Sequence, residues 1–325
     1  MPKATSYDTV GNREDLTDII SLVAPERTPL YSTLPKSAAP KALYQEWQVD
    51  GLDAPTFPGV VDGTDQTTFD NKAKNRARVG NRVQEFREPY MVTRLQQDVA
   101  TAGVPDEYGR SKSRAVLDLR LDIEACLGSD QDIQVGSGSQ ESKLRALGKW
   151  IDSSNTDIPE VARTPSTSIG TTSSLTETTF NAVLQSAYEA SGSASNYMLY
   201  ANTTLKKKIS DFHRVQVDAS NAPNPYRVNE NGKEKSVTLS VMKYDSDWGM
   251  VDIVIDLFLG RSSGGPLDST SKERGYLIAP GMVSLGYLRN PGTEEFEDKG
   301  GGRRGMASAV LTLVCKNPRG LGKFA

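Results

Sequence analysis

The sequence predicts an α+β fold with two weakly separated domains. Three observations support this prediction. A long amphipathic helix is expected at 105–127, and an alternating strand near the end of the chain belongs with it. A second group of helices and strands is expected at 174–290. The 325 residues suffice for two such units with a real core.

The first 43 residues predict an arm rather than a domain. Leu16, Ile19, Ile20 and Val23 share one face of a short predicted helix. The stretch APERTPLYSTLPKSAAPK follows and contains four prolines, which favour an extended chain. A short amphipathic helix followed by such a strap is typical of a segment that lies across another surface.

Two strands are expected at 42–50 and 79–95, and the stretch between them has no helix or strand pattern. It is rich in Pro, Gly, Asp, Thr and Asn and is too long for a hairpin turn. A structureless loop of this size counts against a compact domain unless the loop packs on another chain. We therefore expect residues 50–82 to become ordered on a neighbouring subunit.

The helix at 105–127 has clear end signals, with Pro105 and Asp106 at its start and Gly128 after its end. Its apolar residues form two faces: Val116, Leu119, Ile123 and Cys126 on one, and Leu117, Leu121 and Ala125 on the other. Opposite charges four residues apart are expected to pair on its surface: Arg114 with Asp118, and Arg120 with Glu124. The helix should be packed on more than one side.

Residues 129–175 predict little regular structure beyond one short element at SKLRALGKWIDSS. The composition of TPSTSIGTTSS is typical of a linker. A helix is expected next, over SLTETTFNAVLQSAYEASG, with Ser174 and Glu177 in capping-box spacing. Its predicted buried face consists of Phe180, Val183, Leu184, Ala187 and Tyr188.

A buried strand at NYMLYAN and a helix capped by Asn202 are expected after it. Two strands joined by a turn at DSDWG follow. In the second strand the apolar residues through Leu257 are expected to face one way, and Asp252 and Asp256 the other. Residues 275–288 predict further strand, with a break at Pro280 and Gly281. An exposed loop is expected at 290–305. The stretch MASAVLTLVCK predicts the last strand.

The composition excludes several classes of protein. Lys and Arg number 38 against 41 Asp and Glu, which argues against dedicated nucleic-acid binding. Cys126 and Cys315 are too far apart in sequence for a metal motif, and we interpret both as small core residues. The chain start has no signal-peptide pattern, and no window is apolar enough to span a bilayer. We expect a protein that is made in a cytoplasm and is soluble there.

No active site is predicted. His213 stands alone at the end of a predicted helix and has no assignable nucleophile. VGSGSQESK lacks the Gly-Lys-Ser/Thr ending of a phosphate loop, and Asp62, Asp65 and Asp70 do not have the spacing of a calcium loop. We therefore expect neither an enzyme nor a cofactor or metal.

A cationic cluster surrounds the returning strand of the hairpin. The simpler interpretation is a solvated strand edge. The alternative is that these arginines pair with carboxylates on another subunit, where the planar guanidinium is geometrically selective. The candidates for such contacts are Lys72, Lys74, Arg76, Arg78, Arg82, Glu85 and Arg87.

GNREDLTDIISLVAPERTPLYSTLPK, followed by YQEWQVD, closely resembles the start of the tailed-bacteriophage major head proteins of the SU-ten type. LRALGKWIDS and LTETTFNAVLQSAYEASG are similar to the same family, as is NYMLYANTTLKKKISDF. The resemblance spans most of the chain and implies the Hong Kong ninety-seven capsid fold. Its expected parts are an arm (1–43), an extended loop (44–92), a peripheral domain (93–173) with a spine helix (105–127), an axial domain (174–290) and a return to the peripheral domain (291–325).

The resemblance implies a major capsid protein that self-assembles into the icosahedral head of a tailed double-stranded DNA phage. The expected partners are copies of itself in hexamers and pentamers and a portal protein, with scaffolding and decoration proteins left open. DNA would be enclosed rather than specifically bound, and no membrane is involved. Some capsids of this fold cross-link a loop lysine to an asparagine; Lys72, Lys74 and Asn317 are available, although an ordinary charged loop is the default.

Two alternatives stay open at this point. An encapsulin-like compartment would share the fold but enclose a cargo protein. A phage enzyme that degrades glycans would show paired carboxylates in a groove, and the sequence offers no candidate pair.

Overall fold

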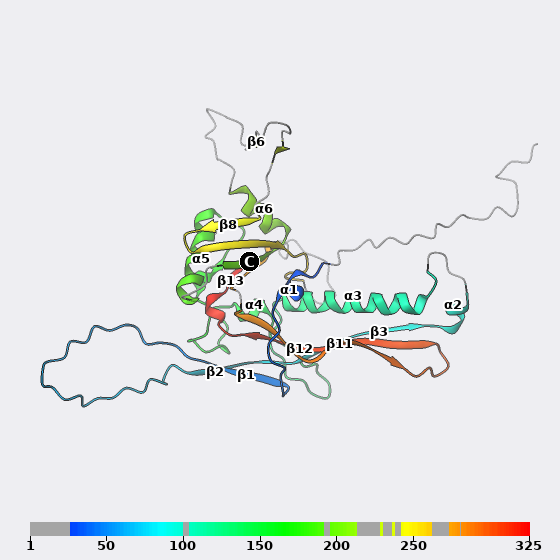
Figure 1. Cartoon of the computed structure of the whole chain (residues 1–325), viewed down its shortest axis with the longest axis horizontal. Helices are drawn as coiled ribbons and strands as arrows, with labels where there is room; N and C mark the ends of the chain where they lie inside the picture. The colour runs from blue at the N-terminus through cyan, green and yellow to red at the C-terminus, as the bar shows by residue number, and fades with distance from the viewer. Residues whose placement is uncertain are drawn as a thin grey trace, which may run out of the picture.

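Residues 27–99, 104–191, 196–212, 228–229, 236–237, 242–261, 273–279 and 281–325 are described by the structure, a computed structural model. Figure 1 shows a long helix lying along an extended sheet, with a second sheet and its helices beside one end of that helix. A long hairpin loop projects from the molecule in the direction away from the helix. The arm helix predicted before Pro25 and His213 lie outside the described residues.

The extended sheet has three antiparallel strands in the order β11-β12-β3. These strands are β3 (Gln84–Val92), β11 (Val283–Phe296) and β12 (Arg303–Cys315). In the central strand β12, every residue from Ala307 to Cys315 is buried. The apolar run AVLTLVC suits a strand that is covered on both faces. The predicted last strand is confirmed.

Strand β11 is longer than predicted. The stretch 290–305 was expected to be an exposed loop, but its first part continues β11 to Phe296 and pairs with β12. The side chains there are mostly exposed because this end of the sheet extends beyond the core, so their polar composition does not indicate a loop. The predicted break before β11 is present, and Gly281 takes a φ of 77° that favours glycine.

Helix α3 (Glu107–Leu127) lies against this sheet and coincides with the helix predicted at 105–127. The Asp106 side chain caps it by accepting a hydrogen bond from the backbone N–H of Tyr108 at 3.0 Å. Its fully buried face consists of Ala115, Leu119, Ile123 and Leu127, whereas the second predicted face (Leu117, Leu121 and Ala125) is half-buried.

Of the two predicted ion pairs on this helix, one is present. Arg114 and Asp118 lie 3.8 Å apart. The predicted pairing of Arg120 with Glu124 is wrong, because Glu124 is fully buried and its carboxyl group binds backbone N–H groups of another segment. Spacing along a helix cannot show which of its charged residues another segment will cover.

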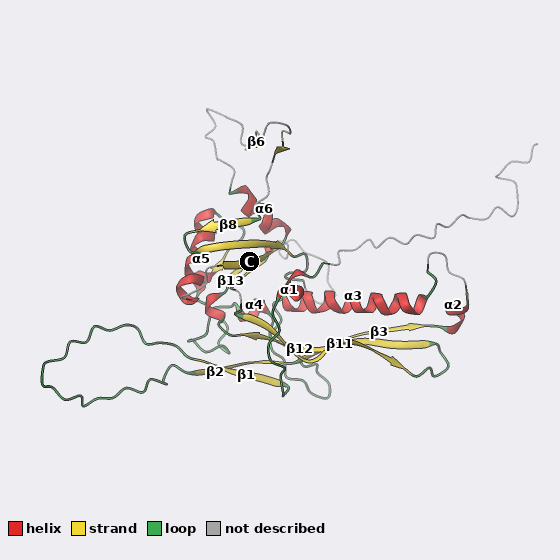
Figure 2. Ribbon diagram, viewed as in Figure 1, coloured by secondary structure: helices red, strands yellow, loops and turns green. Residues whose placement is uncertain are grey.

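The second sheet has six strands in the order β4-β13-β10-β5-β9-β8. They are β4 (Ile169–Gly170), β5 (Asn196–Ala201), β8 (Lys243–Ser246), β9 (Gly249–Ile255), β10 (Gly275–Ile278) and β13 (Gly322–Phe324). Helices α5 (Glu177–Ser191) and α6 (Thr203–Asp211) share a hydrophobic cluster with it. Figure 2 shows this mixed layer above the three-stranded sheet. Two short strands, β6 (Val228–Asn229) and β7 (Ser236–Val237), pair with each other.

The stretch 164–174, predicted to be a linker, is packed into this sheet. Thr164, Ser168 and Thr172 are buried, and β4 pairs with β13. The Thr164 hydroxyl donates to the carbonyl of Pro318 at 2.8 Å, and the Thr172 N–H donates to the carbonyl of Ala325 at 3.1 Å. The prediction was wrong because hydroxyl side chains that find backbone acceptors can be buried at little cost.

Helix α5 is present where predicted, but its start differs. Thr176 and Thr179 each donate a backbone N–H to the other's hydroxyl, at 2.9 and 3.2 Å, so the reciprocal cap is formed there and not by Ser174 and Glu177. The predicted buried face is correct except for Tyr188, which is exposed. Asn202 caps α6 as predicted, accepting from the N–H of Thr203 at 2.7 Å.

The prediction for the end of β9 was wrong. Val251 and Ile253 face the core, but Ile255 is exposed and Asp256 is 1% exposed. The strand ends at Ile255, so the alternation of side chains no longer applies to Asp256.

The described part of the arm lies along the edge of the three-stranded sheet. Leu285 of β11 accepts from the N–H of Ser37 at 2.8 Å and donates to the carbonyl of Pro35 at 2.9 Å. The extended path predicted here is interrupted by a helical turn, α1 (Pro29–Thr33), because Pro29 suits the first position of a helix. Leu30 of α1 is completely buried.

Candidate assembly surfaces

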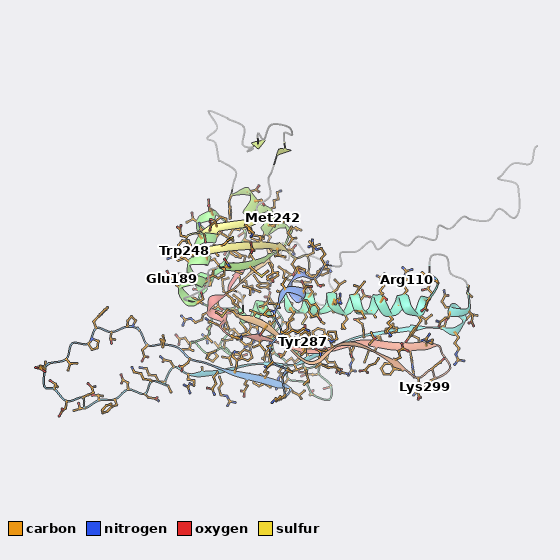
Figure 3. All side chains as sticks on the ribbon, viewed as in Figure 1. Arg110, Glu189, Met242, Trp248, Tyr287 and Lys299 are labelled. Atoms are coloured by element: carbon orange, nitrogen blue, oxygen red, sulfur yellow. The ribbon has the colours of Figure 1, made fainter. Side chains whose placement is uncertain are left out.

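The projecting hairpin is formed by β1 (Tyr44–Val49) and β2 (Ala77–Arg82), which pair antiparallel from Tyr44↔Arg82 to Val49↔Ala77. The strands predicted at 42–50 and 79–95 are thus present, the second being divided into β2 and β3. The loop at 50–76 continues beyond them without regular structure. Figure 3 shows that its side chains stand clear of the rest of the chain.

This loop exposes large apolar side chains. Leu52 and Phe57 are 100% and 99% exposed. The other members of the set are Val60, Val61 and Phe69. Scattered exposed apolar residues are ordinary, but several on one projecting loop with no core of its own form a surface that suits contact with another chain.

The base of the hairpin is anchored by Asn81, which is completely buried. Its amide donates to the carbonyls of Leu313 and Arg145, at 2.8 and 3.0 Å. Its carbonyl accepts from the N–H groups of Arg145 and Arg82, at 2.7 and 2.8 Å. All four hydrogen-bonding positions of the side chain are therefore used within the chain.

Aromatic packing adds to this anchor. The ring centroids of Trp47 of β1 and Trp150 lie 5.6 Å apart, and Trp150 is a fully buried residue at the end of α4 (Leu147–Trp150). The guanidinium of Arg145 lies over the same Trp150 ring and pairs with Asp132 at 2.7 Å and Asp157 at 3.1 Å. The hairpin is thus fixed at its base, whereas the loop at its end makes few contacts.

Four cations of the hairpin, Lys72, Lys74, Arg76 and Arg78, have carboxylate partners in their own chain. Lys72 and Lys74 lie 3.5 and 3.2 Å from Asp53. The amide of Asn75, followed by Lys74, holds the pKa of Asp53 below its usual value. The other hairpin pairs are Arg76 with Asp50 and Arg78 with Glu46. Arg82 lies over the ring of Tyr44.

The remaining candidates, Glu85 and Arg87, lie on β3. Glu85 binds Arg87 at 2.7 Å and Arg289 of β11 at 2.6 Å. The hydrogen bond from Arg87 lowers the pKa of Glu85. Within one chain the structure thus gives both residues a partner, and pairing with another subunit stays a prediction. The three residues named as candidates for a cross-link lie in different places: Lys72 and Lys74 contact Asp53 in the hairpin loop, and Asn317 directly precedes the short helix η3 (Pro318–Gly320).

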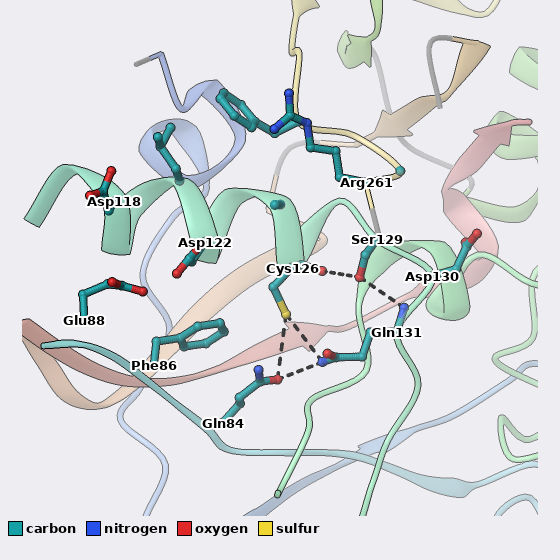
Figure 4. Close-up of a pocket in the computed structure, with 14 residues that line it drawn as sticks. Gln84, Phe86, Glu88, Asp118, Asp122, Cys126, Ser129, Asp130, Gln131 and Arg261 are labelled. Carbon is teal, nitrogen blue, oxygen red and sulfur yellow. Dashed lines mark hydrogen bonds between the residues drawn. The ribbon is translucent and has the colours of Figure 1, made fainter. Parts of the chain in front are cut away.

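A groove of about 910 Å³ lies between α3, β3 and the loop at 258–261 (Figure 4). Four of its lining residues carry carboxyl groups: Glu88, Asp118, Asp122 and Asp130. Burial, then a hydrogen bond to Asp122 and the charges of Asp122 and Asp118, raise the pKa of Glu88 to about 7.

Cys126 also lines this groove, with Sγ 3.5 Å from Nε2 of Gln131 (Figure 4). Burial raises the pKa of the Cys126 thiol to about 12, so it is not an activated nucleophile. Both cysteines are free, as expected. Among the described residues, no group of three or more His, Cys, Asp or Glu side chains is placed to hold a metal ion.

Two features were missed from the sequence. One is the exposed apolar set of the loop, whose signal is isolated Leu, Phe and Val residues within a Pro-, Gly- and Asp-rich stretch. The other is the buried pair Glu124 and Asp256, for which the sequence offers no local signal.

Within the described ranges, no helix is both long and apolar enough to cross a bilayer.

The fold type follows from solved structures. The chain is similar to the capsid protein of cyanophage A-1(L), with 13% identity, a TM-score of 0.66 and 99% of each chain covered. It is also similar to a chain of the capsid of cyanophage P-SCSP1u, with 11% identity, a TM-score of 0.62, and 99% of this chain and 94% of that chain covered. A chain from mycobacterium phage Che8 is similar as well, with 16% identity, a TM-score of 0.53 and 97% of each chain covered. The chain has the fold of phage capsid proteins, the Hong Kong ninety-seven type that the sequence predicted.

The family follows from the sequence. Residues 3–325 match the family model described as SU10 major capsid protein, and the chain belongs to that family. It is a major capsid protein of tailed phages, as the resemblance implied, and this is a structural family and not an enzyme family. The compartment and glycan-degrading alternatives are not favoured. The sequence has no match among curated proteins.

Proposed function

We propose that the loop at 50–76 is the part of this capsid subunit that packs on a neighbouring copy in the shell. The supporting observation is its set of exposed apolar side chains, above all Leu52 and Phe57. Burying one such side chain stabilises by roughly 1.5–3 kcal/mol, so even partial cover of several would hold two subunits together. Many such contacts around a closed lattice act together.

The hairpin cations support this arrangement in a second way. The side chains of Arg76 and Arg78 are 54% and 70% exposed, so their pairs with Asp50 and Glu46 lie in water. An exposed ion pair contributes about 0–1 kcal/mol, so exchanging one carboxylate partner for another costs little. We infer that Lys72, Lys74, Arg76, Arg78, Arg82, Glu85 and Arg87 supply the charged contacts between subunits.

The division of the chain follows the same proposal. Residues 1–43 are the arm, 44–92 the extended loop, 93–173 the peripheral domain with α3 as its spine, 174–290 the axial domain and 291–325 the return. Two hydrophobic clusters support a division into two units, one around α3 and the three-stranded sheet and one around α5, α6 and the six-stranded sheet. The chain crosses between them, since β11 passes residue 290 and β4 and β13 join the six-stranded sheet from outside 174–290.

The partners proposed are other copies of the chain in hexamers and pentamers, a portal protein, and packaged double-stranded DNA held by enclosure. The near balance of 38 cationic and 41 anionic residues suits a wall that does not bind the DNA inside it. Synthesis in the cytoplasm of the bacterial host belongs to the same proposal. A strong, salt-dependent affinity of the unassembled subunit for DNA would contradict this account of the shell.

The test is a triple substitution of Leu52, Phe57 and Phe69 by serine. Because these side chains contact little within the chain, the variant should fold normally and fail to form shells. Electron microscopy and sedimentation measure assembly, and circular dichroism and thermal unfolding measure folding. Val135→Ser is the matched control, since Val135 is also exposed but lies outside the hairpin. Shells at wild-type yield from the triple variant would refute the proposal.

A further inference from the structure

Two buried carboxyl groups meet where three parts of the chain converge. Glu124 lies in the last turn of α3 and is completely buried. Asp256 follows β9 of the six-stranded sheet and is 1% exposed. The third part is α1 of the arm, which contacts the same end of α3 (Figure 1).

The carboxyl group of Glu124 holds the arm through its backbone. Oε1 accepts from the N–H of Leu30 at 2.8 Å, and Oε2 accepts from the N–H of Tyr31 at 2.6 Å. These N–H groups belong to the first turn of α1, where no earlier carbonyl of the helix can accept them. Leu30 is itself fully buried, so the arm is attached here by both apolar and polar contacts.

Asp256 is held from the other side. Its Oδ1 accepts from the N–H of Phe258 at 2.8 Å, and its backbone N–H donates to the carbonyl of Ala201 at 3.1 Å. Its Oδ2 is buried and has no donor among the described residues. A buried oxygen without a donor is costly, and a proton on the facing carboxyl of Glu124 would supply one.

The absence of a neighbouring cation among the described residues also indicates that the two carboxyl groups share a proton. Among the described residues, no lysine or arginine acts on the pKa of either carboxyl group. The other titratable side chains that face them are Tyr200 of β5 and Tyr276 of β10. Burial raises the pKa of both tyrosines, so neither supplies a charge near neutrality. Two carboxylates without a cation cannot both stay ionised in such a place.

We propose that one proton shared by Glu124 and Asp256 latches the arm (residues 27–40) onto α3 and onto the six-stranded sheet. Loss of the proton places two negative charges in the buried site and opens the latch. The inference concerns the subunit alone and does not depend on the proposed packing of the hairpin loop.

The direction of the pH dependence follows from the pKa values. Burial first, and then the charge of Asp256, raise the pKa of Glu124 to about 8 from a usual value of 4.5. Burial also raises the pKa of Asp256. Between pH 4.5 and about pH 8, the closed latch therefore keeps a proton on Glu124 that the open state has released. Closure is strongest below about pH 4.5, weakens as the pH rises towards 8, and weakens no further above it.

The experiment is hydrogen–deuterium exchange of the full-length protein between pH 5 and 9, followed at the amides of Leu30 and Tyr31. The protection factor, which is corrected for intrinsic exchange, should fall by up to about tenfold per pH unit until pH 8. In Asp256→Asn the amide can donate to an ionised Glu124, so protection should persist and lose its pH dependence. Asp65→Asn, in the exposed hairpin loop, is the control and should behave as the wild type.

The variant Glu124→Gln provides a second, independent test. The glutamine amide offers a single acceptor oxygen, so one of the two arm N–H groups loses its partner and protection should fall at every pH. A wild-type protection factor that is constant from pH 5 to 9 would overturn the proposal. The same conclusion would follow if Asp256→Asn kept the full wild-type pH dependence.

Discussion

The side-chain amide of Asn81 donates to the backbone carbonyl of Leu313 at 2.8 Å, which joins the base of the projecting hairpin to the central strand β12. Because the same side chain also binds both backbone groups of Arg145, it fixes three segments at one point. The base of the hairpin is therefore held by buried polar contacts together with the packing of Trp47 on Trp150, and not by its own loop.

Replacing Asn81 with alanine should leave up to three backbone groups buried without partners. Each such group costs about 1–3 kcal/mol, and we expect the free energy of unfolding to fall by roughly 2–4 kcal/mol. Thermal and urea unfolding measure the change. Asn71→Ala, in the exposed loop, is the control and should change the stability by less than about 0.5 kcal/mol. Equal stability of the two variants would contradict the anchoring role.

Glu88 should make the stability of the protein depend on pH. Burial and the neighbouring carboxyls of Asp122 and Asp118 raise its pKa to about 7, so the folded state binds a proton that the unfolded state releases above pH 4.5. This contribution is lost as the pH rises from about 4.5 to 7. Glu88→Gln should therefore raise the melting temperature more at pH 8 than at pH 5. A larger gain at pH 5 would show that the sign is wrong.

Both cysteines should be unreactive in the folded protein. Burial raises the pKa of Cys126 to about 12 and also raises the pKa of Cys315, so little thiolate is present at pH 8. We expect iodoacetamide to modify neither residue in the native protein within an hour and both in urea, as measured by mass spectrometry. Rapid labelling of native Cys126 would show that the groove beside α3 is more open than described.

Much of the fold could be predicted from local patterns. The end signals Asp106 and Gly128 bound α3 correctly, and the apolar run in MASAVLTLVCK located β12, although Ala307 to Cys315 are all buried and do not alternate. These predictions succeed because helix caps and apolar strand runs are local features of the sequence. The family resemblance then supplied the order of the parts, which no local pattern contains.

The errors arise where a distant segment decides the environment. Glu124 was predicted on the helix surface and is buried because the arm covers it, with the N–H of Leu30 as its partner. Thr164 was placed in a linker, but the carbonyl of Pro318 accepts its hydroxyl. The sites of proposed subunit contact are predictable only in part, since the cationic cluster is visible in the sequence and its carboxylate partners are not.

The most direct test of the central claim is photo-cross-linking from the tip of the hairpin loop in assembled particles. A benzophenone side chain in place of Phe57, which is 99% exposed in the single chain, reports what lies beside the loop. Covalently linked dimers and larger multimers are the predicted products on a denaturing gel. Irradiated particles that yield only the single-chain band would contradict the claim that the loop packs on a neighbouring subunit.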